Sequence, residues 1–209
     1  MGRQFDDSRL VLFDPDLPAG VLNLDRVLFL DFDGVLHPEG CGASMEFMYS
    51  ENFCEVMAQV DPAGEVPIVI SSMWRFDEDL KRLRSHLEPR LGRQVVGVTP
   101  DRCPKEDGQS GGWGTHAVSG VTHGIRQDEI ETWMQLHAPG AQWLAIDDRA
   151  DAFAVRCPHL FLVPGIYEDD GGGIDAVQAL RLKARLREFL GLNEAVPAVG
   201  VKKPGSGPA

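Results

Sequence analysis

Short, mostly apolar runs alternate along the chain with amphipathic stretches. Five of these runs have the length and composition of strands that are buried on both faces, namely residues 27–31, 67–71, 94–99, 142–147 and 159–163. Strands of this kind, separated by helices, predict parallel strands joined by helical crossovers. We therefore expect an α/β fold, a doubly wound parallel sheet of about five strands.

Apolar residues recur at every third or fourth position between the predicted strands, as on one face of a helix. One helix is predicted after Ser50, which is suited to cap it, and a second over residues 80–91 after Asp77. A third is predicted around residues 130–137 and a last one over residues 174–190. We expect these helices to cover both faces of the sheet.

A chain of 209 residues fits one domain of ordinary size. The predicted elements place this domain at residues 26–191, after an N-terminal extension at residues 1–25. The tail, residues 192–209, is rich in Pro, Gly and Ala, and we expect it to be disordered. Residues 100–123 are long for a structureless connection, so we interpret them as either a flexible surface loop or a functional flap.

The composition is that of a globular protein and narrows the kinds of partner. No apolar run is long enough to span a bilayer, and residues 1–7 lack the pattern of a secretory signal, so we expect a cytoplasmic protein without a membrane partner. The four cysteines form no Cys-x-x-Cys pair, which indicates reduced thiols. A formal net charge of −12 disfavours nucleic acid without excluding it, and leaves small phosphate esters as ligands.

Two carboxylates, Asp31 and Asp33, follow the first predicted strand directly and precede Gly34. In an unbroken strand they would point the same way and repel each other, unless a cation or a turn at the glycine relieves the repulsion. Mg²⁺ prefers such oxygen ligands and shares them with substrate phosphates. One carboxylate can attack phosphorus while the second transfers protons, and a glycine here lets backbone amides approach a phosphate.

A second pair of aspartates, Asp14 and Asp16, also follows an apolar run. Pro15 lies between them, and Leu17-Pro18 follows where a glycine would be needed. We interpret this pair as part of a loop or an edge strand rather than as catalytic groups.

Hydroxyl groups mark the end of the second predicted strand, which continues Ser71-Ser72-Met73-Trp74-Arg75. A hydroxyl at this place can bind a phosphate oxygen; alternatively, Ser71 or Ser72 caps the following helix. Trp74 and Arg75 are candidates for stacking on or clamping a substrate, although Trp74 could equally belong to the core.

Charged residues mark two further helix and strand ends. Arg126 begins the helix before the fourth strand, where it either balances phosphate and carboxylate charge or is an ordinary surface arginine. Asp147 and Asp148 end the fourth strand and need a positive partner. Alternatively, Asp148 and Asp151 belong to a helix cap and its first turn, which leaves Asp147 unexplained.

Taken together and in this order, the four segments resemble the motifs of the haloacid dehalogenase (HAD) superfamily of phosphohydrolases, whose sheet is Rossmann-like. The resemblance covers about residues 26–163, and the Ser-Ser-Met-Trp-Arg stretch is similar to a subgroup with small or absent cap domains. It implies that Asp31 is the nucleophile and Asp33 the general acid/base. It also implies that Ser71 binds phosphate and that Arg126 is the basic residue of the third motif.

The resemblance further implies that Mg²⁺ is the cofactor. Members of the superfamily usually bind it through the nucleophile, the backbone carbonyl of the second aspartate and an acid of the fourth motif. These groups correspond to Asp31, Asp33 and Asp148, with Asp147 beside them. The third motif usually carries lysine, so Lys105 is the alternative to Arg126.

We therefore expect a Mg²⁺-dependent phosphohydrolase that acts on a phosphate monoester through an aspartyl-phosphate intermediate. Its partner is a phosphorylated small molecule or an exposed phosphate on a macromolecule, and the sequence fixes neither the substrate nor the oligomeric state. Two alternatives stay open. One is a nucleic-acid end-processing phosphatase or repair module, and the other is a non-catalytic interaction protein with a HAD fold.

Overall fold

A computed structural model describes residues 10–17, 23–101, 116–118, 121–123, 125–164 and 172–192. Its centre is a five-stranded sheet in the order β3-β2-β1-β6-β7, in which all neighbouring strands are parallel. The strands are β1 (Arg26–Leu30), β2 (Ile68–Ile70), β3 (Val95–Val98), β6 (Gln142–Asp147) and β7 (Leu160–Leu162). Each overlaps one predicted strand, so the predicted doubly wound sheet is confirmed.

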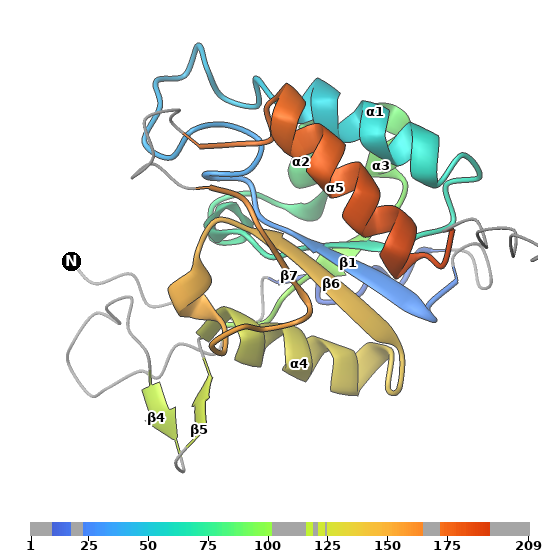
Figure 1. Cartoon of the computed structure of the whole chain (residues 1–209). Helices are drawn as coiled ribbons and strands as arrows, with labels where there is room; N and C mark the ends of the chain where they lie inside the picture. The colour runs from blue at the N-terminus through green and yellow to red at the C-terminus, as the bar shows by residue number, and fades with distance from the viewer. Residues whose placement is uncertain are drawn as a thin grey trace, which may run out of the picture.

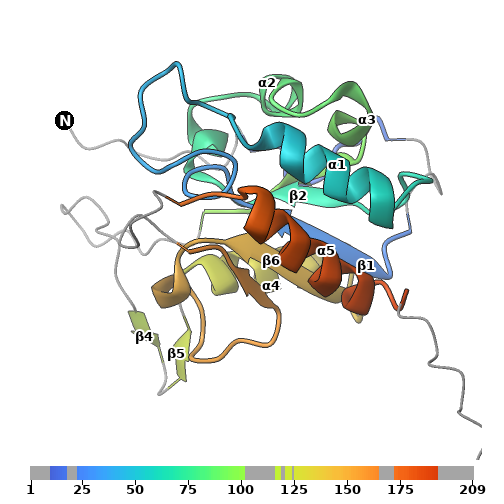
Figure 2. The ribbon, with the colours of Figure 1, turned by 45° about the horizontal axis from the view of Figure 1, so that its top comes forward.

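Helices cover both faces of the sheet (Figure 1). One face carries α1 (Ser50–Val60), α2 (Leu80–Ser85), α3 (Pro89–Gly92) and α5 (Ala176–Phe189), as the tilted view also shows (Figure 2). The other face carries α4 (Ile125–His137). Alternate residues of each central strand enter different layers: Leu28 and Leu30 of β1 pack under α1 and α5, whereas Val27 and Phe29 pack against α4.

The helix predicted over residues 80–91 is in fact two short helices. Asp79 caps α2, its side chain accepting a hydrogen bond from the Arg82 amide at 2.7 Å. Pro89 then begins α3, because proline lacks the amide hydrogen that a continuing helix would need. The predicted cap at Ser50 is also wrong: Tyr49 occupies that position, and the Ser50 hydroxyl instead donates to the carbonyl of His86.

Short elements complete the described chain. Two one-turn 3₁₀ helices, η2 (Met73–Phe76) and η3 (Ala150–Ala152), follow β2 and β6. The segment predicted as a loop or flap contains an antiparallel pair, β4 (His116–Val118) and β5 (Val121–His123), which stands away from the sheet (Figure 1). Residues 102–115, which include Lys105, residues 119 and 120, and the predicted disordered tail from residue 193 onward lie outside the described residues.

Residues 10–14 of the N-terminal extension run along the open edge of β3. The Val98 amide donates to the Val11 carbonyl at 3.1 Å, and the Asp14 amide donates to the Val96 carbonyl at 2.7 Å. Between them, a side chain on Gly97 would place its Cβ 2.1 Å from the Leu12 carbonyl oxygen. Glycine at this position therefore permits the close approach by which the extension protects an edge strand.

Asp14 belongs to this edge contact. Its carboxylate pairs with Arg84 at 2.6 Å, and the pKa of Asp14 is lowered, chiefly because its side chain accepts a hydrogen bond from the Asp16 amide. The structure thus supports the interpretation of this aspartate pair as part of an edge segment.

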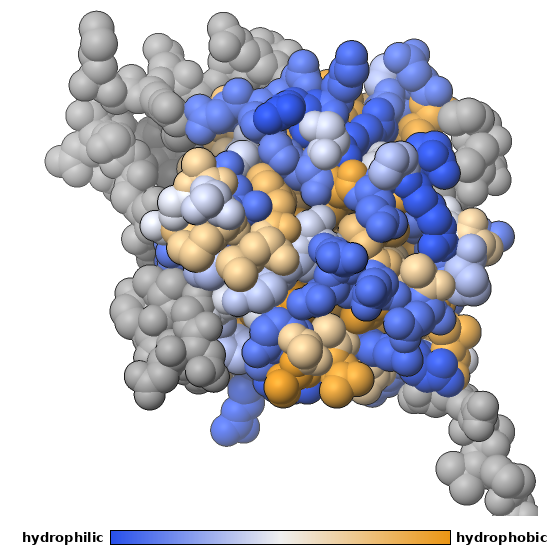
Figure 3. Space-filling model, turned by 90° about the horizontal axis from the view of Figure 1, so that it is seen from above, coloured by the Kyte–Doolittle hydropathy of each residue, from blue (hydrophilic) through white to orange (hydrophobic). Residues whose placement is uncertain are grey.

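The outer surface of the layer that contains α1 and α5 is mostly hydrophilic, with smaller apolar patches between the polar residues (Figure 3). Within the described ranges, no helix has both the length and the apolar character needed to cross a bilayer.

Candidate active site

The site lies where the strand order reverses. From β1 the chain proceeds outward to β2 and β3, then returns to the other side of β1 to form β6 and β7. Asp31 directly follows β1, and Asp147 ends the neighbouring β6. Ligands of doubly wound sheets bind outside the carboxyl ends of the strands at such a reversal. The Asp31 amide also donates to the Ile146 carbonyl at 3.1 Å, which fixes the first aspartate against β6.

Three carboxylates gather at this reversal. Asp31, Asp147 and Asp148 each offer one oxygen, and these atoms all lie within 4.8 Å of one another. Burial, then the neighbouring charges of Asp31 and Glu39, raise the pKa of Asp148 to about 7. Burial and the charge of Asp31 likewise raise the pKa of Asp147, although Arg126 opposes them. Ionising all three carboxylates at once is therefore unfavourable without a further cation. Their oxygens are the hard donors that suit Mg²⁺.

Gly34 lets the loop after β1 pass against the third carboxylate of this cluster. It has a φ of +70°, and a Cβ added to it would lie 2.0 Å from Asp148 Oδ2. Only glycine satisfies both the left-handed backbone and the absence of space. The same turn directs the Phe32 amide to Asp31 Oδ1 at 2.7 Å, which orients the carboxylate.

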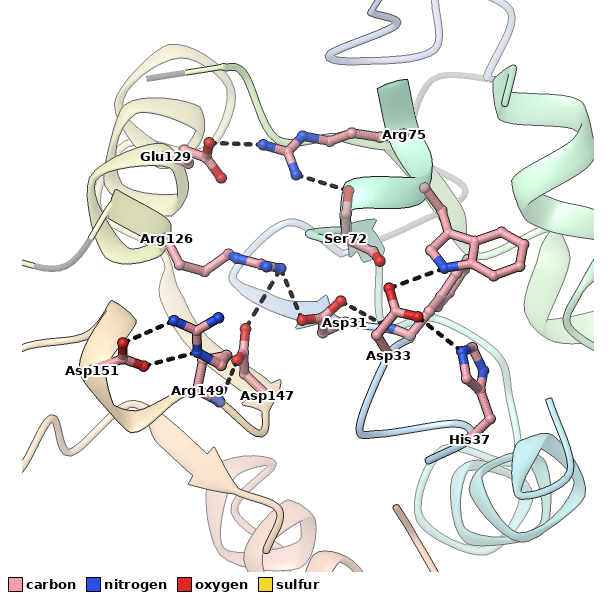
Figure 4. A network of polar contacts seen from close by, with 12 residues as sticks. Asp31, Asp33, His37, Ser72, Arg75, Arg126, Glu129, Asp147, Arg149 and Asp151 are labelled. Carbon is pink, nitrogen blue, oxygen red and sulfur yellow. Dashed lines mark hydrogen bonds and ion pairs between the residues drawn. The ribbon is translucent and has the colours of Figure 1, made fainter. Parts of the chain in front are cut away.

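Arg126 is the positive partner of the cluster. Its Nη1 lies 3.1 Å from Asp31 Oδ2 and 3.6 Å from Asp147 Oδ2 (Figure 4). The interpretation as a surface arginine is wrong, because the residue is only 4% exposed. Burial opposes its charge, but Asp31 and Asp147 raise the pKa of Arg126 above its usual range, so it stays cationic.

Two buried serines follow β2, the strand next to β1. Ser71 donates its amide to the Leu30 carbonyl at 2.8 Å, which places it next to the start of the Asp31 turn. Ser71 and Ser72 are both buried, and neither hydroxyl has a hydrogen-bond partner among the residues that the structure describes. Ser72 occupies the cap position of η2, as the capping alternative predicted, but its side chain makes no capping hydrogen bond. Buried unpaired hydroxyls are costly, and phosphate oxygens would satisfy them.

The capping alternative for the fourth segment holds only for Asp151, which lies in the first turn of η3. Arg149, not Asp148, occupies the cap position of η3, and no side chain caps that helix. Asp151 instead forms a two-pronged ion pair with the Arg149 side chain at 2.9 and 2.8 Å. Asp147 accepts a hydrogen bond from the Arg149 amide at 2.8 Å, which fixes its carboxylate in the cluster.

A family model described as the HAD domain in Swiss Army Knife RNA repair proteins matches residues 27–164. The match spans well over half of the chain and contains all the residues of the cluster and its hydroxyl neighbours. The chain belongs to this HAD family. Searches of curated proteins and of solved structures each found no match.

In this HAD domain the second aspartate of the first motif lies apart from the carboxylate cluster. Asp33 Oδ1 lies 3.0 Å from His37 Nε2, and Asp33 Oδ2 accepts a hydrogen bond from Trp74 Nε1 at 3.0 Å (Figure 4). Burial opposes ionisation, but these two hydrogen bonds lower the pKa of Asp33. The sequence suggested Trp74 as a candidate substrate contact. In the HAD domain its indole instead binds Asp33, a candidate catalytic group.

Arg75, the other candidate for substrate contact, is buried behind the site. Its guanidinium donates to Glu129 Oε1 at 2.7 Å and to the Ser72 carbonyl at 2.7 Å, and it lies over the Phe76 ring. The side chain therefore connects η2 of the HAD domain with α4, which carries Arg126 (Figure 4).

Sequence reasoning missed Glu129 and His37. Glu129 lies one helical turn beyond Arg126, a spacing that places both on one side of α4, so this signal could have been used. His37 follows Asp33 by four residues in an irregular segment, and no periodicity indicates that their side chains meet.

Proposed function

We propose that the chain is a Mg²⁺-dependent phosphohydrolase that cleaves a phosphate monoester through an aspartyl-phosphate on Asp31. The observation that carries this proposal is the convergence of three carboxylates at the strand reversal, within 4.8 Å of one another. Beside them lie two buried hydroxyls without partners in the described chain and a buried arginine. Carboxylates for a cation and donors for an anion, side by side, are what a phosphate–Mg²⁺ pair requires.

The metal would be held by the side chains of Asp31, Asp147 and Asp148, and by the Asp33 backbone carbonyl that the family resemblance implies. When bound, Mg²⁺ offsets the mutual repulsion of the carboxylates and polarises a phosphoryl oxygen. Arg126 pairs with Asp31 and Asp147, and the charge of Arg149 also acts to lower the pKa of Asp148. The pKa of Asp148 is nevertheless raised, which supports the need for a further cation.

The residues of the chain divide the chemistry between them. Ser71, Ser72 and Arg126 donate hydrogen bonds to the phosphate oxygens and orient phosphorus toward Asp31. An oxygen of Asp31 forms a bond to phosphorus as the bond to the leaving oxygen breaks, and Asp33, which must enter this step in its protonated form, gives that oxygen its proton. Asp33 then takes a proton from water, whose oxygen bonds to phosphorus and releases Asp31 as a free carboxylate.

This chemistry explains features that a purely structural, non-catalytic role does not. A buried cluster of like charges and buried unpaired hydroxyls both reduce stability, and an interaction protein would gain nothing by keeping them. Their placement at the strand reversal supports catalysis over the interaction alternative.

Release of phosphate from p-nitrophenyl phosphate, with and without Mg²⁺, tests the proposal. Asp31→Asn should lower the rate by about a thousandfold or more, because it removes the nucleophile while keeping the shape of the side chain. The matched control is Asp16→Asn, the exposed member of the aspartate pair in the edge segment, which should retain full activity. Equal activity of the Asp31→Asn variant would refute the assignment.

A second, narrower candidate is the removal of terminal phosphates from RNA. The family description, a HAD domain of RNA repair proteins, favours it. The net charge of −12 opposes binding to a polyanion, so contact with RNA would depend on a few local groups near the scissile phosphate.

Oligoribonucleotides that carry a 3′- or a 5′-phosphate, compared with mononucleotides of the same end structure, test this candidate at low and moderate salt. An RNA phosphatase should turn over one type of end with a kcat/KM at least about tenfold above that for the mononucleotide, since flanking phosphodiesters add binding energy. If the mononucleotides were turned over and the oligomers gave no higher kcat/KM, the RNA candidate would be excluded in favour of a small-molecule phosphatase.

A further inference from the structure

The Asp33 carboxylate is held at both of its oxygens by residues from two different segments. His37 lies in the irregular chain after β1, and Trp74 lies in η2, after β2. Their ring nitrogens each lie 3.0 Å from a different oxygen of Asp33 (Figure 4). We propose that His37 and Trp74 are positioning residues, which hold the Asp33 side chain where it exchanges protons with the leaving oxygen and with water. This inference rests on the proposed phosphohydrolase function.

Two contacts from separate segments restrict the carboxylate more than either would alone. With one donor, the carboxylate could still rotate about the bond to its Cβ; with both, rotation breaks one hydrogen bond or the other. The side chain of Asp33 is nevertheless 38% exposed, so it is held on one side and open on the other. An open but fixed carboxylate suits proton transfer, which requires heavy atoms within hydrogen-bond distance of the reacting group.

The position of His37 is hard to explain by stability alone. The residue is 2% exposed, and its Nδ1 is buried with no hydrogen-bond partner in the part of the chain that the structure describes. A buried unpaired ring nitrogen costs free energy, and an apolar residue would fill the same space without that cost. The contact with Asp33 is the one polar interaction of the ring that the structure records among the described residues, and it accounts for a histidine here.

An aromatic cluster holds both positioning residues in place. The Phe47 ring lies 5.0 Å from the His37 ring and 5.1 Å from the Trp74 ring, and it stacks on His86 at 4.1 Å. Phe47 itself has a φ of 59°, a left-handed conformation that is strained for a bulky residue. Such strain persists where the surrounding packing determines the backbone, and it is common beside functional groups.

Trp74→Phe tests the proposal, because it keeps an aromatic ring and removes only the indole donor. Proton donation by Asp33 matters most when the leaving oxygen is strongly basic, so the variant should be compared on an alkyl phosphate and on p-nitrophenyl phosphate. We expect kcat to fall about tenfold more on the alkyl ester than on the aryl ester. In an Asp33→Asn background, the same substitution should add no further selective loss, since it acts through Asp33.

Trp133→Phe is the matched control. Trp133 also donates its indole hydrogen, here to the Leu12 carbonyl at 2.6 Å, but on the α4 side of the sheet and away from Asp33. Its loss should lower the stability of the protein and leave the ratio of kcat on the alkyl ester to kcat on the aryl ester unchanged. An equal fall on both substrates in Trp74→Phe, or no fall at all, would show a structural role and overturn the proposal.

His37 can be tested by loss and rescue. His37→Leu removes the polar contact, whereas His37→Gln can place an amide nitrogen near the position of Nε2. The glutamine variant should recover most of the alkyl-ester activity that the leucine variant loses. If the glutamine and leucine variants had the same ratio of kcat on the alkyl ester to kcat on the aryl ester, a positioning role for the ring nitrogen would be contradicted.

A crystal structure of Trp74→Phe gives a readout that does not depend on activity. The Asp33 carboxylate should leave its present position or occupy more than one, while the carboxylates of Asp31 and Asp148 stay in place. An unmoved Asp33 would overturn the inference even in a protein with no turnover. The opposite result is also informative. If Asp33 moved in Trp74→Phe while the Asp31→Asn variant stayed active, the inference that Trp74 positions Asp33 would hold and the proposed function would be refuted.

Discussion

At the scale of single residues, position 34 carries two separate demands. The backbone requires a positive φ of +70°, and the space that a Cβ would need is already filled by Asp148. Gly40, a few residues further along, shares the first demand with a φ of +68°, but no described atom lies within 4 Å of the place that its Cβ would take. Comparing the two glycines therefore separates the effect of backbone strain from that of collision with the Asp148 carboxylate.

Gly34→Ala should weaken Mg²⁺ binding more than Gly40→Ala does, although the two should lose similar stability without metal. Both variants lose about 1 kcal/mol of stability to a left-handed alanine, which thermal unfolding without metal can measure. Only Gly34→Ala displaces Asp148, so only it should weaken Mg²⁺ binding, by about tenfold or more, as followed by the Mg²⁺ dependence of the melting temperature. Equal Mg²⁺ responses of the two variants would contradict the role assigned to this close approach.

The residues of the site differ in how far the sequence could predict them. Asp31, Asp147 and Asp148 lie at the carboxyl ends of buried strands, and parallel strands end at one edge of a sheet, so their meeting was predictable. The burial of Arg126 was not, because a helix start can face the solvent or the sheet with the same local sequence. The contact between Asp33 and Trp74 joins positions 41 apart in the chain, through loops whose paths no pattern describes.

At the scale of elements, patterns predicted strands better than helices. Strands buried on both faces appear as continuous apolar runs, so all five were located to within one or two residues. The leucine spacing over residues 80–91 correctly marked a buried face, yet Pro89 divided the helix there. The pairing of residues 10–14 with the edge of β3 was foreseen only as an edge-strand alternative, since pairing across the whole chain has no local signal.

The ion pair between Arg75 and Glu129 joins two elements that carry site residues. Both side chains are nearly inaccessible, 1% and 5% exposed, and the 2.7 Å contact links η2 to α4. Arg75→Leu would leave a buried carboxylate without this partner, so we expect a loss of about 3–5 kcal/mol in the free energy of unfolding, measured by urea denaturation. Adding Glu129→Leu should recover part of that loss, because it removes the carboxylate that has lost its Arg75 partner.

Arg82 provides the control for this element-scale prediction. It lies 3.6 Å from Glu78, and its side chain is 66% exposed. Arg82→Ala should change stability by less than about 1 kcal/mol, as expected for a pair exposed to water. If Arg75→Leu were no more destabilising than Arg82→Ala, the buried pair would not be the connection between η2 and α4 that its geometry indicates.

At the scale of the whole molecule, the acidic chain gathers three of its carboxylates into one cluster. The net charge is −12, and three carboxylates meet at one strand reversal, where Arg126 pairs with Asp31 and Asp147. Without a metal, the folded protein relieves this repulsion by keeping protons that the unfolded chain would release. Stability, pH and Mg²⁺ should therefore be linked through the same few groups.

Asp148→Asn isolates this linkage. The folded pKa of Asp148 is about 7 against an ordinary value of 3.8, so between these values the folded state binds more protons than the unfolded state. The contribution of Asp148 to stability is therefore present at low pH and is lost as pH rises through about 7. An asparagine, which is always neutral, avoids that loss. In EDTA the variant should gain stability relative to the natural protein as the pH is raised from about 5 to about 8, as measured by urea denaturation.

Mg²⁺ should reverse the sign of this difference. It replaces the missing protons with a cation that binds only the folded cluster, so it stabilises the natural protein most at about pH 8, where Asp148 is ionised. The asparagine variant loses one ligand and should gain much less from the metal. It would thus be the more stable protein in EDTA and the less stable one in millimolar Mg²⁺. The same order of stabilities in both buffers would mean that the carboxylate cluster does not bind the ion, whereas a reversal would locate the ion at Asp148 without any assay of catalysis.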